Sequence, residues 1–300
     1  MTLRIMVSRH SAFYSPLISV IAAGFLERRG LSAEYRVLAK GQRSSELIRE
    51  GKVDIMQSAV SSNWKPMERG ETPLPVHFAQ INQRDGFFLV ARNPGPAFRW
   101  ADLEGKVVVG DHAFQPMAML RYAGRVNGVD WARVRLVDAG EPEQMERAFR
   151  EGTGDYVHLQ SPAAHQLEHD GVGAIAASVG ESMPPVAFSS LCCSREFLNT
   201  PACQAFLEAY AEARAWVRSA AVEEVARAEA AFFPGVAREA LQAALRRYQA
   251  LGCWDGGIEI PRDLYEQALD VFESVGAIAH RHPQDAVCLS AWPARHHRVP

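Results

Sequence analysis

The chain has 300 residues, of which 48% are hydrophobic and 22% charged, and its formal net charge is −3. This length exceeds that of most single-core domains, so we expect two compact units. The small negative charge provides no basic field of the kind that binds a phosphate backbone, which argues against nucleic acid as a partner.

The apolar segments of the sequence are short. None reaches the roughly 18–20 residues that would cross a bilayer, so we expect no membrane insertion. The run Leu3–Val7 is too short and too early for the core of a signal peptide, which predicts a cytoplasmic protein. A periplasmic location is the alternative if an upstream signal has been removed. The five cysteines lack regular spacing, which favours free thiols over a disulfide framework or a zinc site.

Short apolar runs alternate with longer amphipathic ones, which predicts an α/β fold with parallel strands joined by helices. The expected strands are Leu3–Val7, Leu31–Leu38, Val53–Gln57, Val107–Gly110, Arg135–Val137 and Gly154–Leu159. The expected helices are Pro16–Arg29, Gly41–Glu50, Ser61–Arg69, one ending at Arg125, Pro142–Arg150 and Pro162–His169. Extended runs at Val76–Ala91 and Val186–Cys193 are the places where we expect the chain to cross between two sheets.

The last third of the chain reads as successive helices over Pro201–Phe232, Val236–Ala250 and Pro261–Val275, which we expect to pack on the first lobe. The expected lobes are residues 1–84 with 190–278, and residues 85–189. Residues 279–300 are rich in Pro, Arg and His without periodicity, which predicts a flexible tail.

Four segments, matched in order, suggest a family. They are Ala23–Leu31, Leu47–Ile55, Asp102–Gly110 and Phe149–Asp155. Over residues 3–278 the chain resembles the type II periplasmic binding proteins of the branch that binds alkanesulfonates, nitrate and thiamine-pyrimidine precursors and that includes the thiamine-pyrimidine synthases. The resemblance implies two mixed sheets flanked by helices, two hinge crossovers, and a ligand cleft at the carboxyl ends of the strands. General rules for open α/β sheets favour the same location.

The loops at these strand ends carry the candidate binding residues. Helix starts in both lobes offer backbone N–H groups, which favours a negatively polarised ligand, and aromatic side chains suit a flat or apolar ligand body. The candidate ligand-binding residues are Arg9, His10, Phe13, Tyr14, Lys40, Gln42, Gln57, Ser58, Ala59, Asn82, His112, Ala113, Phe114, Gln115, Gln160, Ser161 and Ser189. Packing by Phe13 and Tyr14, and solvation of Arg9, remain open as alternatives.

The resemblance also extends to cytosolic enzymes. Thiamine-pyrimidine synthases place a lysine and a histidine around the third strand, where this sequence has Ser58 and Ser62, and sulfinate desulfinases place a cysteine where it has His10. We therefore expect no cofactor and no metal. The main prediction is a binding protein for a small, anionic or heteroaromatic molecule, which serves an ABC transporter permease or is a cytosolic relative.

The alternative is a cytosolic enzyme on the same fold, a decarboxylase, desulfinase or pyrimidine synthase acting on a small aromatic acid. His10 or His112 would then be the candidate general base, since histidine titrates near neutral pH.

Overall fold

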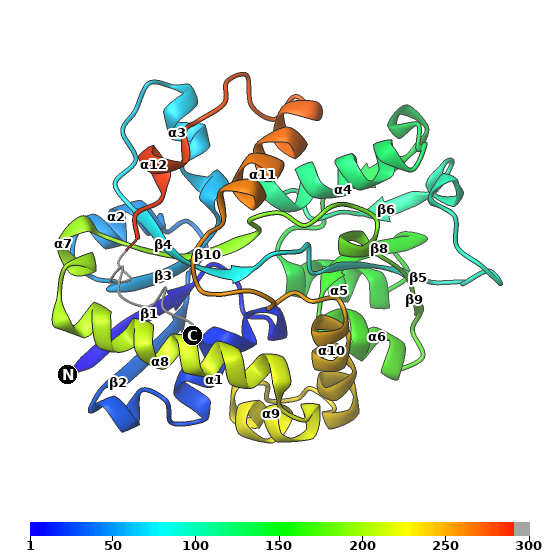
Figure 1. Ribbon diagram of the computed structural model, residues 1–300. Helices are drawn as coiled ribbons and strands as arrows, with labels where there is room; N and C mark the ends of the chain where they lie inside the picture. Colours follow the sequence, from blue (N-terminus) through cyan, green and yellow to red (C-terminus); the bar gives the residue numbers. More distant parts are fainter. Residues whose placement is uncertain (291–300) are drawn as a thin grey trace, which may run out of the picture.

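The chain forms two five-stranded sheets flanked by helices in a computed structural model, which describes residues 1–290 (Figure 1). In spatial order, the first sheet contains β2 (Ser32–Val37), β1 (Thr2–Val7), β3 (Ile55–Ser58), β10 (Ser189–Cys193) and β4 (Val76–Asn82). The second contains β7 (Arg135–Val137), β6 (Val107–Val109), β8 (Tyr156–Gln160), β5 (Phe87–Ala91) and β9 (Ala174–Ser178). We call the units built on these sheets the first and the second lobe.

Both sheets are mixed, as predicted. Strand β1 runs parallel to β2 and β3, whereas β10 runs antiparallel to β3 and β4. In the second lobe β6 is parallel to β7 and β8, and β5 is antiparallel to β8 and β9. The sequence analysis predicts no strand at β9, because its small side chains, Ala-Ile-Ala-Ala-Ser, lack the alternation of apolar and polar residues on which that prediction depends.

The helices are α1 (Ser15–Ala22), α2 (Ser44–Arg49), α3 (Trp64–Glu68), α4 (Phe114–Val126), α5 (Pro142–Arg150), α6 (Ala163–His169), α7 (Arg195–Leu198), α8 (Pro201–Ser219), α9 (Val222–Glu229), α10 (Arg238–Ala250), α11 (Arg262–Ser274) and α12 (Gln284–Val287). The helix predicted over Pro16–Arg29 ends early because Gly24 adopts a positive φ of 71°. The helix predicted over Pro201–Phe232 is broken between α8 and α9, where Gln249 donates hydrogen bonds to the carbonyls of Val217 and Ala220.

The chain crosses between the lobes twice, from β4 to β5 and from β9 to β10 (Figure 1). Both crossovers lie in or beside the extended runs identified in the sequence. They are also bonded to each other, since the backbone N–H groups of Val186 and Phe188 donate to the carbonyls of Gln83 and Asn82. The lobe boundaries expected near residues 84 and 189 remain a prediction, although Ser189 itself lies in the first sheet.

The C-terminal helices contact both lobes. Helix α8 packs on α1 of the first lobe, but α10 packs against α6 and α11 against α4, which both belong to the second lobe (Figure 1). The prediction that these helices pack on the first lobe was therefore incomplete. Hydrophobic periodicity shows that a helix has an apolar face but not which partner covers it.

The prediction of a flexible tail over residues 279–300 is wrong for its first part. Residues 279–290 contain α12, the side chain of Val287 is fully buried, and the hydroxyl of Tyr265 donates to the carbonyl of His282. A bridge between His77 and Cys288 joins this segment to β4. Residues 291–300 lie outside the described residues. Between residues 1 and 290, no helix has both the length and the hydrophobicity that crossing a bilayer requires.

Candidate functional site

The largest cavity described, about 550 Å³ in volume, lies between the two lobes. Its first-lobe wall comes from the loop after β1, from Val37 at the end of β2, and from residues 232–236 between α9 and α10. Its second-lobe wall comes from β5, from the loops after β6 and β8, and from the faces of α5 and α6. A molecule in this cavity would therefore contact both lobes at once.

A second cavity of about 200 Å³ lies in the same cleft. It is lined by the loop after β3, by the start of α4 and by Ser189 of β10. Arg9, Phe87 and Gln160 line both cavities, so the two spaces are neighbours that share walls. Together they occupy the carboxyl ends of the parallel strands, where the family resemblance places the ligand.

An ion pair joins the lobes across the cleft. The guanidinium of Arg9, in the loop after β1, binds the carboxylate of Asp111, in the loop after β6. The side chains are only 20% and 6% exposed. Burial opposes ionisation of Asp111, but the charge of Arg9 and the hydrogen bonds from Arg9 and Ala113 together outweigh it and lower the pKa of this carboxyl group. Asp111 also accepts a hydrogen bond from the N–H of Ala113. The pair is thus fully charged and links the walls of the cleft.

Hydrogen bonds reinforce this contact between the lobes. The carbonyl of Ser161 accepts from the N–H of Ala12 and the hydroxyl of Ser11. The hydroxyl of Ser61 donates to Gln115 at 2.6 Å, and Gln115 in turn donates to the carbonyl of Phe188 at 2.8 Å. The structure therefore describes the lobes in direct contact.

The N–H groups expected to receive an anion at the helix after β1 already have partners. This helix is a single 3-10 turn, Ala12–Tyr14, capped by Ser11. The N–H of Phe13 donates to the hydroxyl of Ser11, and that of Tyr14 to its carbonyl. Together with the bond from Ala12 to Ser161, these contacts leave this turn no free donor for a ligand. The sequence shows that a helix starts here but not that its donors are occupied.

His10 lines the larger cavity, but both of its ring nitrogens are occupied. Nε2 lies 2.6 Å from the carbonyl of Phe232 and must donate, so Nδ1 accepts from the hydroxyl of Tyr35 at 2.9 Å. Burial lowers the pKa of His10, which keeps the ring neutral at neutral pH. His10 therefore fixes residues 232–236 over the cavity, and this arrangement leaves no nitrogen available as a general base.

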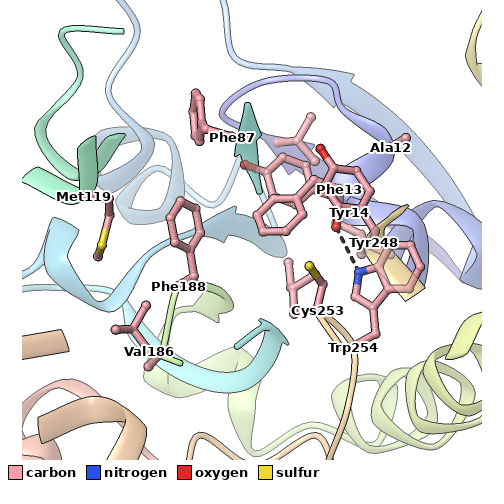
Figure 2. Close-up of a cluster of buried hydrophobic side chains, with 14 of the residues drawn as sticks. Ala12, Phe13, Tyr14, Phe87, Met119, Val186, Phe188, Tyr248, Cys253 and Trp254 are labelled. Atoms are coloured by element: carbon pink, nitrogen blue, oxygen red, sulfur yellow. Dashed lines mark hydrogen bonds between the residues drawn. The ribbon is translucent and has the colours of Figure 1, made fainter. Parts of the chain in front are cut away.

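Phe13 and Asn82 belong to the core rather than to the cleft. The ring of Phe13 is fully buried and meets Phe188 edge to face at 5.4 Å. Its carbonyl accepts from the amide of Asn82 at 2.7 Å and from the indole of Trp254 at 3.1 Å, the bond drawn in Figure 2. Figure 2 shows Phe13 packed beside Tyr248. The prediction that Phe13 and Asn82 bind ligand is contradicted, because neither lines a cleft cavity.

Lys40, Gln42 and His112 also lie outside both cleft cavities. Lys40 and Gln42 lie in the exposed turn after β2, where Gln42 accepts a hydrogen bond from the N–H of Ala39. His112 is exposed and its Nδ1 donates to the carbonyl of Gly110. The structure therefore does not bring these three residues together with the others, and their contact with a ligand stays a prediction.

The remaining predicted residues do gather in the cleft. Those that line one or both cavities are Arg9, His10, Tyr14, Gln57, Ser58, Ala59, Ala113, Phe114, Gln115, Gln160, Ser161 and Ser189. That they bind a ligand stays a prediction. The sequence analysis missed Phe87, Asp111, Glu143, Arg150 and residues 232–236. Of these residues, only Asp111 could have been identified from the sequence, because it lies in the loop after β6 that the sequence analysis had already selected.

Comparison with known proteins decides the family. The model of the family described as NMT1/THI5 like matches residues 13–222. The chain belongs to the NMT1/THI5-like family. This confirms the resemblance found in the sequence. One relative of this family member, named "Putative binding protein YtlA" in Bacillus subtilis (strain 168), is 27% identical over 245 residues, which cover 80% of this chain and 73% of the relative.

Solved structures confirm the fold of the family member. The ligand-binding component of an ABC-type import system from Staphylococcus aureus superposes with a TM-score of 0.78 at 12% identity, covering 97% of both chains. The periplasmic aliphatic sulphonate binding protein SsuA from Escherichia coli gives a TM-score of 0.72 at 16% identity, covering 96% of this chain and 97% of SsuA. The fold is that of the type II periplasmic binding proteins.

Histidine, cysteine and carboxylate side chains do not assemble into any group of three or more that could hold a metal ion within residues 1–290.

The Asp111→Asn variant of this family member should close its lobes less tightly. Without the carboxylate, the largely buried charge of Arg9 loses its partner, and the contact between the lobes weakens. We expect a larger radius of gyration by small-angle X-ray scattering. As a control, Glu71→Gln removes a carboxylate from the exposed pair with Arg69 and should leave the radius unchanged. Identical radii for Asp111→Asn and the parent protein would contradict this role.

Proposed function

We propose that this protein is a solute-binding protein that closes its two lobes around a small organic molecule. The cavity of about 550 Å³ between the lobes carries the proposal. Its volume lies within the roughly 300–1,000 Å³ typical of ligand pockets, and its walls come from both lobes.

The construction of the cleft supports closure as the working motion. A ligand shifts an equilibrium between open and closed states only by its difference in affinity for the two. Because the lining is divided between the lobes, a ligand gains its full set of contacts only when they meet. The ion pair of Arg9 with Asp111 would add to the stability of that closed form.

The comparisons support a role in transport. One structural neighbour is named as the ligand-binding component of an ABC-type import system, another as a periplasmic sulphonate binding protein, and the relative from Bacillus subtilis is also named as a binding protein. We extend this to a partnership with an ABC transporter permease, or to a cytosolic protein that keeps the binding function. Fractionation of cells that produce the protein from its natural gene would distinguish a cytoplasmic from a periplasmic location.

The enzyme alternative finds less support in the cleft. None of the five cysteines lines either cleft cavity, and burial raises the pKa of Cys192 to about 12. The nitrogens of His10 are occupied by Phe232 and Tyr35. The cysteine nucleophile and the His10 general base expected for this alternative are therefore not available to a molecule in the two cleft cavities.

The first test is a thermal-shift screen of small organic molecules, followed by mass spectrometry of each stabilising compound after incubation. A ligand present at 100 times its Kd should stabilise the fold by about 2.7 kcal/mol and be recovered unchanged. Recovery of a converted product would favour the enzyme alternative instead.

A matched pair of variants places the ligand. Val37 lines the larger cavity and is 47% exposed, so Val37→Trp should fill the cavity mouth and abolish the ligand-induced shift without unfolding the protein. Val126 is 52% exposed and lines neither cleft cavity, so Val126→Trp should keep the full shift. An undiminished shift in Val37→Trp would place the ligand elsewhere and reject the proposed site.

A further inference from the structure

The larger cavity has an excess of negative charge. Two arginines line it, Arg9 and Arg150, against the four carboxylates of Asp111, Glu143, Glu146 and Asp170. With His10 neutral, the formal charges leave an excess of two negative charges. A cavity of this kind favours a positively charged molecule over an anion of the same shape.

Both arginines are already paired. Arg9 binds Asp111, and Arg150 binds Glu146 and Asp170, each at 2.8 Å. An anionic ligand would have to displace a carboxylate from one of these pairs before it gained a cationic partner. The two guanidinium groups of the cavity are therefore not free to pair with an anionic ligand.

Glu143 is the carboxylate left without a cation. It lies near the start of α5 and lines the cavity, and within residues 1–290 no ion pair engages it. Its charge is felt across the cavity, since it acts to raise the pKa of His10. Glu143 is thus an available partner for a cationic group that enters from the cleft.

Gln160 provides an independent observation that also points to a donor on the ligand. Its side chain is more than nine-tenths buried, with a relative exposure of 8%, and it lines both cavities. Its amide interacts with the hydroxyl of Tyr14, yet its Oε1 has no hydrogen-bond partner. An unsatisfied buried carbonyl destabilises the protein, and a ligand N–H group would supply the missing hydrogen bond.

The apolar part of the wall sets the remaining chemistry. Phe87, Phe232 and Phe233 contribute rings to the cavity, which suit a flat organic body. Aromatic faces also attract cations. We infer that the ligand is a small organic cation, with an ammonium, amidinium or protonated amino-heterocyclic group that pairs with Glu143 and donates to Gln160. This inference rests on the proposed function and specifies its ligand class.

The test compares probes of one shape and opposite charge. Benzamidine, which is cationic at neutral pH, is titrated calorimetrically against benzoate, and phenethylamine against 3-phenylpropanoate. We expect each cation to bind at least 10-fold more tightly than its anionic counterpart. Glu143→Gln should weaken cation binding about 10-fold. Glu151→Gln, which removes an exposed carboxylate just beyond α5 that does not line the cavity, should leave binding unchanged.

Each outcome separates this inference from the proposed function. Tighter binding of the anions, abolished by Val37→Trp, would overturn the inference and leave the solute-binding proposal standing. If none of the four probes binds, the thermal-shift screen decides the ligand class. The compound to consider is the one that stabilises the parent protein but not Val37→Trp. A cationic compound supports the inference, and an anionic or neutral compound overturns it. If no compound behaves in this way, the proposed function fails and the inference fails with it.

Discussion

At pH 8 the Glu229→Gln variant should be more stable than the parent protein by on the order of 4 kcal/mol. Glu229, on α9, is fully buried, and its carboxyl oxygens bond the hydroxyls of Ser15 and Ser19 on α1 at 2.8 and 2.6 Å. No ion pair engages it within residues 1–290. Burial raises its pKa from 4.5 to about 8.

The sign of the effect follows from these two pKa values. Between about pH 4.5 and 8 the unfolded chain releases this proton while the folded protein keeps it. The stability that the protonated group contributes is complete below pH 4.5 and is lost as the pH rises toward 8. Glutamine remains neutral at every pH, so the stability of the variant does not fall with the titration of this group.

Urea unfolding at pH 5 and pH 8 measures the difference. The advantage of Glu229→Gln over the parent should be small at pH 5 and large at pH 8. Asp85, whose buried carboxyl group has a pKa also raised to about 8, gives both proteins a common residual slope. Glu239→Gln, at an exposed position of α10, serves as the control with no such advantage. If the difference in free energy of unfolding between the variant and the parent is equal at the two pH values, Glu229 is not a buried carboxyl group that stays protonated.

The Gly180→Ala variant should lose about 2–3 kcal/mol of stability, because overpacking forces the backbone to shift. A Cβ atom at Gly180, in the turn after β9, would lie 2.2 Å from the backbone carbonyl oxygen of Asp85. This is the place where the two crossovers approach each other, and a carbonyl cannot rotate away as a flexible side chain does.

Gly95→Ala is the matched control. The nearest atom to a Cβ there is 3.9 Å away, so its effect should stay within about 0.5 kcal/mol. Denaturant midpoints of the two variants and the parent measure the comparison. The close contact between the crossovers would be refuted by equal midpoints for Gly180→Ala and Gly95→Ala.

The order of elements was predictable because most strands carry strong local signals. The alternating burial of β1, the buried runs at β3 and β8, and the glycines that end the neighbouring helices are properties of adjacent residues. The location of the cleft then follows from topology alone, since parallel strands of one sheet end on the same side.

The lining of the cleft was less predictable because it depends on partners far apart in the sequence. His10 faces Phe232 across 222 residues, and Phe13 is drawn into the core by Trp254, 241 residues away. The segment after β1 therefore contains both cavity residues such as His10 and the core residue Phe13, and local sequence does not separate them. Glu143 was missed because it is an exposed charged residue of the amphipathic helix α5, and the local sequence does not show that a cavity lies beside it.

The packing of the C-terminal helices means that the second lobe is not a structurally independent module. Residues 85–189 are continuous in sequence, which invites excision or exchange between homologous proteins as a cassette. Yet α11 covers part of α4, and α10 covers part of α6. A chimaera that imports residues 85–189 alone would set foreign helix faces against the resident α10 and α11. Exchange of the second lobe therefore also requires that the new faces of α4 and α6 match the resident α11 and α10.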